Sequence, residues 1–376
     1  MQFKARAVQA GGARMKLVIF GLSISSSWGN GHATLWRGLV RALARRGWTV
    51  IFFERDLPYY AGARDLYDIE DGELVLYSDW DEALPAARRH LADADVALVS
   101  SYCPDGIAAS DLVLSSPRPL HLFYDLDTPV TLSALERGEA TSYIGPRGLS
   151  DFDLVLSYTG GEALDALKAR LGARMVAPLY GHVDPCVHRP TMPAARYSAD
   201  LSYIGTYAED RQAGVEAFML EPARQRPNLR FVIAGAQYPE NFPWVENLYF
   251  VRHLPPEEHP AFYSSSRLTL NVTRRAMAKM GWCPSGRLFE AASCGVPIIS
   301  DSWEGLETFF EPGREVLVAV DTEDVTGALD LGDAELRRIA EAARERVLSC
   351  HTSEHRAAEF ETIANDLKSV AAGEAA

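Results

Sequence analysis

Short apolar runs alternate with amphipathic stretches along most of this chain, from residue 16 onward. The apolar runs have the length of buried strands, and the clearest amphipathic stretch, 33–46, repeats its apolar residues at helical spacing. Such alternation predicts an α/β fold built on doubly wound parallel sheets. The predicted strands are 16–22, 49–54, 74–77, 96–100, 120–124, 154–157, 174–177, 201–205, 230–235, 249–251, 268–272, 296–300 and 316–320.

The alternation stops at residues 180–193, which contain three prolines and no periodicity, and then restarts. A segment of this kind is typical of an interdomain linker. The chain is therefore predicted to form two Rossmann-like domains that face a cleft, where ligands bind in such folds. The expected parts are a disordered leader 1–14 before a second possible start at Met15, a first domain 15–180, a linker 181–195, a second domain 196–350 and a helical tail 351–376 that packs back on the first domain.

The charge balance narrows the choice of partners. The chain has 37 Lys and Arg against 51 Asp and Glu, a net charge of −14. Nucleic-acid binding needs a basic surface, so no nucleic-acid partner is expected, although a few local arginines can hold a small anion. The five cysteines have no paired spacing, which predicts neither disulfides nor a zinc site and favours a cytoplasmic location. No apolar run approaches the ~20 residues of a membrane span.

The most informative segment is 284–312, PSGRLFEAASCGVPIISDSWEGLETFFEP. Pro284 and Ser285 predict a helix start with Ser285 as its cap, and Gly295 predicts the helix end before a buried strand. The free amides of a helix N-terminus and an adjacent arginine suit a phosphate, which is expected to bind at Ser285, Gly286 and Arg287. Glu290, one turn further on, can accept hydrogen bonds from ribose hydroxyls. The segment therefore predicts a binding site for a nucleotide diphosphate.

The same segment resembles the donor-binding motif of glycosyltransferases with the GT-B architecture, most of all the bacterial group similar to the spore maturation protein CgeB. The matching positions are 285, 287–292, 294–297 and 300–306, and weaker similarity extends over nearly the whole chain from Met15, with a glycosyltransferase group 1-type second domain. Many retaining relatives carry a second glutamate eight positions before the one at Glu290, where this chain has Trp282. The resemblance therefore implies the fold and the donor site, but not a retaining mechanism.

A glycine-rich loop follows the first predicted strand and opens the first helix with Gly29, Asn30, Gly31 and His32. Its glycines lack the spacing of a dinucleotide fingerprint, so nicotinamide binding is not favoured. The helix start favours a neutral imidazole, and a neutral His32 that faces a cleft can act as a general base or bind an acceptor. Alternatively, His32 only caps the helix. The resemblance supports the first interpretation, because inverting GT-B enzymes often have a histidine in this loop.

Two acids, Asp125 and Asp127, end a buried strand of the same domain. Either one can orient His32 and stabilise its protonated form. The Asp-x-Asp spacing also permits metal binding, although no third ligand is evident. A further alternative is that Asp127 only caps the next helix.

In the second domain, several loops that follow predicted strands carry candidate donor contacts. Each has a plainer alternative as a turn, a helix cap or a surface charge. The candidates are Gly205 and Thr206 as phosphate-binding amides, Arg211 and Arg274 as diphosphate-binding cations, His253 and Leu254 as contacts to the base, and Glu304 and Gly305 as contacts to the transferred sugar.

Together these features predict a hexosyltransferase-like glycosyltransferase that moves a sugar from a nucleotide diphosphate, which we expect to be UDP, to a hydroxyl of a glycan or a small molecule. The nucleotide sugar is a co-substrate, and neither a metal nor another cofactor is expected. Two alternatives stay open: a sugar-nucleotide epimerase with the GT-B fold, and a protein that binds sugar nucleotides without turnover.

Overall fold

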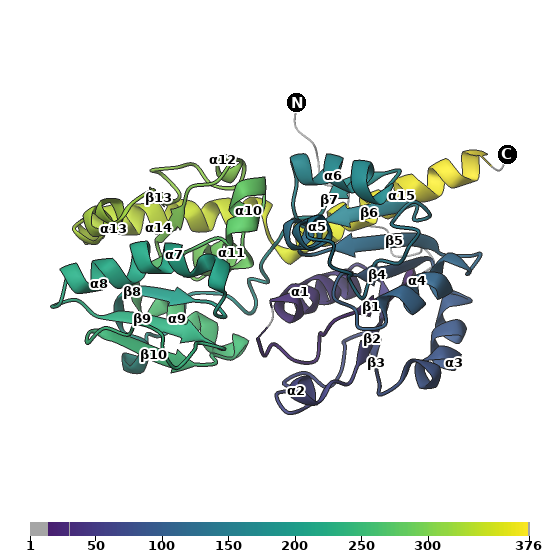
Figure 1. The fold of residues 1–376 in the computed structure, drawn as a ribbon, viewed down its shortest axis with the longest axis horizontal. Coiled ribbons are helices and arrows are strands. Elements are labelled where there is room, and N and C mark those ends of the chain that lie inside the picture. The colour runs from purple at the N-terminus through teal and green to yellow at the C-terminus, as the bar shows by residue number, and fades with distance from the viewer. Residues whose placement is uncertain (1–13, 30, 375–376) are drawn as a thin grey trace.

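The computed structural model describes residues 14–29 and 31–374. The expected leader, apart from Arg14, and the candidate Asn30 lie outside the described residues. The described chain forms two parallel sheets, each covered by helices on both faces (Figure 1). This confirms the predicted α/β architecture of two doubly wound domains. No helix within the described ranges has the length and apolar character needed to cross a membrane.

The first sheet has seven parallel strands in the order β3-β2-β1-β4-β5-β6-β7. Its central strands are buried throughout, because helices cover both faces of the sheet. Its strands are β1 (Lys16–Gly21), β2 (Thr49–Arg55), β3 (Gly72–Tyr77), β4 (Val96–Ser100), β5 (Leu120–Asp125), β6 (Leu154–Ser157) and β7 (Val176–Pro178). Its helices are α1 (His32–Arg45), α2 (Pro58–Ala61), α3 (Trp80–Leu91), α4 (Gly106–Leu114), α5 (Thr128–Glu136) and α6 (Glu162–Leu171).

The second sheet has six parallel strands in the order β10-β9-β8-β11-β12-β13. The strands are β8 (Ala199–Ile204), β9 (Phe231–Gly235), β10 (Leu248–Arg252), β11 (Ser266–Asn271), β12 (Ile298–Asp301) and β13 (Leu317–Ala319). The helices are η1 (Ala195–Tyr197), η2 (Glu209–Arg211), α7 (Gln212–Val215), η3 (Glu216–Leu220), α8 (Glu221–Gln225), η4 (Pro256–Glu258), α9 (His259–Ser264), α10 (Arg275–Met280), α11 (Gly286–Ser293), α12 (Leu306–Phe309), α13 (Thr322–Leu329) and α14 (Asp333–Cys350).

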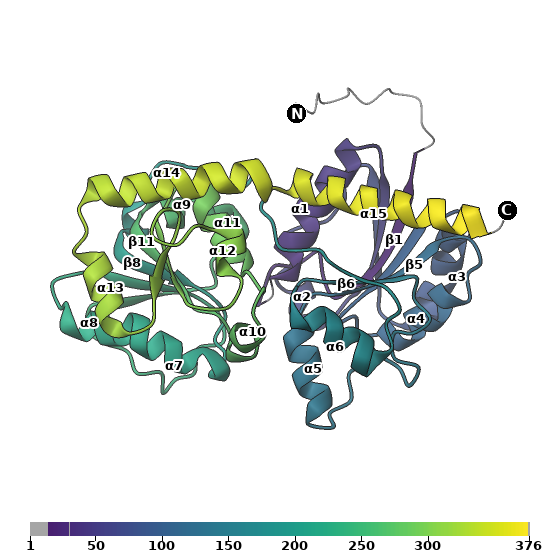
Figure 2. The same cartoon turned by 90° about the horizontal axis from the view of Figure 1, so that it is seen from above.

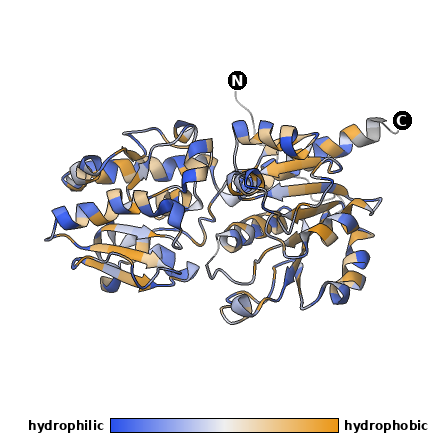
Figure 3. Cartoon of the chain, in the orientation of Figure 1, coloured by the Kyte–Doolittle hydropathy of each residue, from blue (hydrophilic) through white to orange (hydrophobic). Residues whose placement is uncertain are grey.

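The predicted strands all occur, with ends displaced by one or two residues. β7, for example, begins at Val176 and not at Arg174, because Arg174 and Met175 form an exposed bend before the sheet pairing starts. Apolar residues concentrate in the strands of both sheets, which is the pattern expected of strands covered on both faces (Figure 3).

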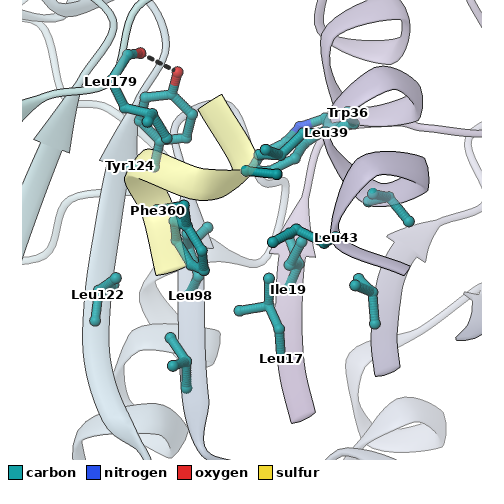
Figure 4. Close-up of a cluster of buried hydrophobic side chains, with 14 of the residues drawn as sticks. Leu17, Ile19, Trp36, Leu39, Leu43, Leu98, Leu122, Tyr124, Leu179 and Phe360 are labelled. Carbon is teal, nitrogen blue, oxygen red and sulfur yellow. Dashed lines mark hydrogen bonds between the residues drawn. The ribbon is translucent and has the colours of Figure 1, made fainter. Parts of the chain in front are cut away.

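The last helix, α15 (Ser353–Glu374), crosses to the first domain, whereas α14 covers the second (Figure 2). The side chain of Phe360 lies among leucines of the first sheet (Figure 4), and its ring meets that of Trp48 edge to face at 5.6 Å. Arg46 and Glu361 form an ion pair on the same contact. The chain therefore passes between the domains twice, once after β7 and once before α15.

Candidate functional site

A cavity of about 510 Å³ lies between the two domains. Loops that follow the carboxyl ends of strands in both sheets line it, as expected for doubly wound sheets. The predicted residues that line it are Gly29, Gly31, His32 and Asp127 from the first domain, and Gly205, Thr206, Arg211, His253, Leu254, Arg274, Ser285, Gly286, Arg287 and Glu290 from the second. The structure thus brings most of the predicted site together.

The N-terminus of α11 opens into this cavity. Ser285 occupies the N-cap position, but its side chain makes no capping hydrogen bond within the described structure, contrary to the expectation that it caps the helix. The amides of Gly286 and Arg287 likewise have no hydrogen-bond partner among the described residues. A side chain on Gly286 would meet nothing closer than the Tyr158 hydroxyl at 3.8 Å. The helix end therefore offers free donors and open space, which suits an anion.

Arg287 is held at the ends of two strands. One nitrogen, Nη1, donates to Oδ1 of Asn271 at 2.6 Å, and Nε donates to the carbonyl of Ile204. The guanidinium also lies 5.1 Å from the ring centre of Tyr203. Asn271 is fixed in turn by a 2.9 Å hydrogen bond from its amide to Ser300. The cation is therefore positioned before any ligand binds.

Glu290, one turn into α11, lies beside two histidines. Its Oε2 is 3.6 Å from Nδ1 of His259 and 3.9 Å from Nε2 of His188. Burial alone would raise the pKa of Glu290, but the neighbouring histidines and Arg287 lower it below its ordinary value. Burial lowers the pKa of His188 to about 4. Glu290 is thus a carboxylate acceptor at neutral pH.

The loop after β8 fits its predicted role in part, because the Thr206 amide has no hydrogen-bond partner among the described residues. The Gly205 amide donates to the carbonyl of Ala234 at 2.9 Å, so it is not free for a phosphate. Arg211 lines the cavity, but its Nη1 already donates to the Tyr203 hydroxyl at 2.9 Å and to the Thr206 carbonyl at 3.2 Å. Only a glycine fits at position 205, since a Cβ there would lie 2.6 Å from the Tyr203 hydroxyl.

Arg274 lines the cavity and pairs with Asp210, with Nε 3.1 Å from Oδ2. His253 holds a left-handed backbone conformation, φ 49°, after β10, and its amide donates to Gly235 at 2.8 Å. A histidine in this region is costly, and such strain is frequent at binding sites. Within the described ranges, no hydrogen bond occupies the Leu254 amide.

On the first-domain side, Nε2 of His32 lies 2.8 Å from Oδ2 of Asp127, and both side chains line the cavity. A carboxylate can only accept, so Nε2 carries the proton. The other ring nitrogen, Nδ1, is buried without a partner in the described structure. The Tyr102 ring packs edge to face against the imidazole at 5.9 Å. The polar contact of the His32 side chain is therefore with Asp127, and the side chain does not cap α1.

Asp125 does not join this pair. It is fully buried, does not line the cavity, and its Oδ1 accepts from the Asp127 amide and the Thr131 hydroxyl, each at 3.1 Å. Burial and the neighbouring Asp127 raise the pKa of Asp125 to about 7. Asp125 is the last residue of β5, where the strand is buried, whereas Asp127 lies beyond the strand. Of the two acids, Asp127 is the one that contacts His32.

The remaining alternatives for these acids find no support in the described structure. Asp127 stands at the N-cap of α5 but makes no capping hydrogen bond there. Among the described residues, neither Asp125 nor Asp127 belongs to a cluster of three potential metal ligands.

Glu304 and Gly305 also lie outside the cavity lining, contrary to their predicted contact with the sugar. Both residues pack against Trp282: its amide donates to the Glu304 carbonyl at 2.7 Å, and a Cβ on Gly305 would lie 2.6 Å from its ring. Its ring also sits against Gly161 of the first domain, where a Cβ would lie 2.5 Å away. Trp282 thus contacts both domains.

Two supports of the site escaped the sequence analysis. Glu54 is fully buried at the end of β2 and accepts from Ser23 Oγ at 2.9 Å, Ser25 Oγ at 2.6 Å, and the amides of Ile24 and Ser25 at 2.7 and 2.9 Å. It fixes the loop that leads to His32. The one available signal was a charged residue at the end of an otherwise apolar strand. The contacts of His188 and His259 with Glu290 left no signal in the sequence.

Comparison with known proteins agrees with this geometry. Residues 211–362 match the family described as glycosyl transferase-like. No curated protein sequence matches the chain.

Solved structures show the same fold at low identity. Sucrose-phosphate synthase from Thermosynechococcus elongatus aligns with a TM-score of 0.70 and 15% identity over 95% of this chain and 100% of that one. HepE from Anabaena, in complex with UDP and glucose, gives 0.65 and 12% over 94% and 100%. An alpha-glucosyltransferase in complex with UDP-glucose and DNA gives 0.65 and 13% over 93% and 99%. The chain therefore has the two-domain GT-B fold of glycosyltransferases, and its second domain carries the sequence pattern of glycosyl transferase-like proteins.

Proposed function

We propose that this protein is a glycosyltransferase of the CgeB-like group that transfers a sugar from a UDP-sugar to a hydroxyl acceptor. One observation carries the proposal: a single cavity has free helix amides, Arg287 and Glu290 on one wall and the His32–Asp127 pair on the other. The first set suits a nucleotide diphosphate, and the second suits a hydroxyl that must lose its proton.

On the donor side, the diphosphate binds at Ser285, Gly286 and Arg287. The amides of Gly286 and Arg287 point into the cavity at a helix N-terminus, where negative charge is favoured. Glu290 accepts hydrogen bonds from the ribose hydroxyls. The free Leu254 amide is placed to meet the edge of the base, beside the strained His253.

On the acceptor side, His32 takes the proton. Because Asp127 accepts the Nε2 proton, the Nδ1 lone pair is the basic position, and acceptor binding must uncover it from its buried setting. The acceptor oxygen attacks the anomeric carbon while the bond from that carbon to the diphosphate oxygen breaks. The proton passes to Nδ1, and UDP leaves with its charge stabilised by α11 and Arg287. A single displacement inverts the anomeric carbon, and the presence of Trp282 at the outer glutamate position favours this over retention.

The donor assignment is tested with UDP-, GDP- and ADP-sugars. We expect release of UDP from a UDP-sugar; an epimerase releases no nucleotide, and a non-catalytic protein only binds it. In calorimetry, Arg287→Ala should weaken UDP binding by one to two orders of magnitude, because a charge-assisted contact contributes about 1.5–3 kcal/mol. Arg275→Ala, which removes an exposed cation from the neighbouring α10, is the matched control. Unchanged UDP affinity in folded Arg287→Ala protein would refute this placement.

A further inference from the structure

Three potential metal ligands from three separate segments meet on the donor wall of the cavity: His188 before β8, His259 at the start of α9 and Glu290 in α11. Nε2 of His188 is 3.4 Å from Nδ1 of His259 and 3.9 Å from Oε2 of Glu290. Nδ1 of His259 is 3.6 Å from the same carboxylate oxygen. Three ligand atoms therefore form a triangle with nearly equal sides.

These separations fit a shared metal ion better than direct hydrogen bonds. Hydrogen bonds of this type span about 2.7–3.2 Å, so each side of the triangle is too long for a good one. Zinc binds histidine nitrogen and carboxylate oxygen at about 2.0–2.2 Å in a tetrahedron, which places neighbouring ligand atoms about 3.3–3.5 Å apart. The observed sides of 3.4, 3.6 and 3.9 Å need only a small contraction to reach that geometry.

The ring orientation also suits a metal. Nε2 of His259 lies 3.3 Å from the Leu254 carbonyl, which can only accept, so a neutral ring that donates there presents the Nδ1 lone pair to the triangle. A metal-binding histidine is usually oriented by such a contact from its other nitrogen. The backbone of His188 is fixed as well, since Ser293 Oγ donates to its carbonyl at 2.6 Å. The ring of His259 is therefore oriented without a metal, whereas Nδ1 of His188 has no partner in the described structure.

Two of the three ligands border the cavity, which leaves that side of the triangle open for a fourth ligand atom. His259 and Glu290 line the cavity, whereas His188 is 1% exposed and closes the site from behind. A site with three protein ligands and one open position is the arrangement that leaves a metal free to take a water or a ligand atom.

We propose that His188, His259 and Glu290 bind one divalent transition-metal ion of the zinc type, and that the metal and the donor nucleotide exclude each other. The exclusion rests on the proposed function, because Glu290 is also the carboxylate assigned to the ribose. A metal on Glu290 occupies the oxygen that the ribose hydroxyls need. The site is thus an inhibitory metal site inside the donor pocket.

Metal binding is tested first, without any substrate. Co²⁺, a spectroscopic substitute for Zn²⁺, is titrated into the metal-free full-length protein. We expect one equivalent to bind with the visible absorption of a four-coordinate ion and without a thiolate charge-transfer band, which separates this site from the exposed Cys186 and Cys350. His259→Gln and His188→Gln should weaken that binding at least a hundredfold.

His253→Gln is the matched control, because His253 also lines the cavity but does not belong to the triangle. It should keep the cobalt spectrum of the unchanged protein. Absence of a stoichiometric cobalt spectrum, a thiolate band, or the same affinity in His259→Gln as in the unchanged protein would each overturn the metal site.

Exclusion is tested by adding UDP-glucose to the cobalt-loaded protein. Loss of the spectrum in the unchanged protein but not in Arg287→Ala supports competition in the donor site, because simple chelation would act on both. An altered spectrum that keeps the metal bound overturns exclusion. If calorimetry on metal-free protein shows no UDP binding while cobalt binds as expected, the donor assignment fails and the metal site stands.

Discussion

Asp125 and Asp127 are two residues apart in sequence but lie in different environments. Asp127 reaches the cavity and contacts His32, whereas Asp125 is enclosed and accepts hydrogen bonds from its own loop. The sequence could place both acids at a strand end, because an apolar run followed by polar residues marks that end. It could not tell which one faces the cavity, since that depends on the residue at which the strand ends.

The raised pKa of Asp125 predicts a pH-dependent stability. Its pKa rises from an ordinary 3.8 to about 7 on folding, so the folded chain holds this proton more tightly than the unfolded chain. The protonated Asp125 carboxyl therefore stabilises the fold fully below about pH 4. This stabilisation, up to about 4 kcal/mol in the free energy of unfolding, is lost as the pH rises through about 7. Asp127 and Tyr143 are among the titratable groups that interact with it.

In Asp125→Asn this loss should be absent. Urea unfolding of both proteins at several values between about pH 5 and pH 8 measures the difference. The exposed Asp81→Asn variant controls for a general loss of negative charge. Parallel stability curves for unchanged protein and Asp125→Asn across this range would contradict the buried, protonated carboxyl.

At the scale of elements, the loop between β1 and α1 depends on Glu54. Its carboxylate accepts four hydrogen bonds from the loop in a fully buried site. In Glu54→Gln the side-chain NH₂ group faces donors, so hydrogen bonds are lost and buried groups stay unpaired. We expect a loss of about 2–4 kcal/mol in the free energy of unfolding and a misplaced His32.

Denaturant unfolding and turnover of the same preparation measure both effects. Glu70→Gln, at an exposed position close by in the sequence, should change neither. Full stability together with full turnover in Glu54→Gln would show that the loop is held by other contacts.

The strands and the helix of the donor motif could be predicted because each depends on local spacing. α11 begins after Pro284 and ends before Gly295, which has the left-handed φ of 75° expected of a helix-terminating glycine. The neighbours of Glu290 could not be predicted. His188 and His259 reach it from a linker and from another helix, and no local pattern records which side chains a tertiary fold brings together.

For the whole molecule, Trp282 is the main candidate for controlling how the domains meet. Its carbonyl accepts from the Gly160 amide at 3.0 Å, and its ring packs between Gly161 and Gly305. We predict that donor binding closes the domains further, because cleft enzymes exclude water in this way. Trp282→Ala should enlarge the radius of gyration of the free protein and weaken UDP binding, since binding must then also order the domains.

Small-angle scattering with and without UDP-sugar measures the closure. Trp244→Ala, in the segment between β9 and β10 of the second sheet, is the matched control and should scatter like the unchanged protein. Identical profiles for unchanged protein and Trp282→Ala, with and without the donor, would contradict a role for this contact.

The central claim is that the two walls of the cavity act together in one inverting transfer. The most direct test is the configuration at the anomeric carbon of the first product, followed by NMR with an α-linked UDP-sugar and either an acceptor hydroxyl or water. The account predicts a β product, and a His32→Gln variant that binds UDP normally but loses about 10²–10⁴-fold in turnover. An α product, or near-normal turnover in His32→Gln, would contradict it.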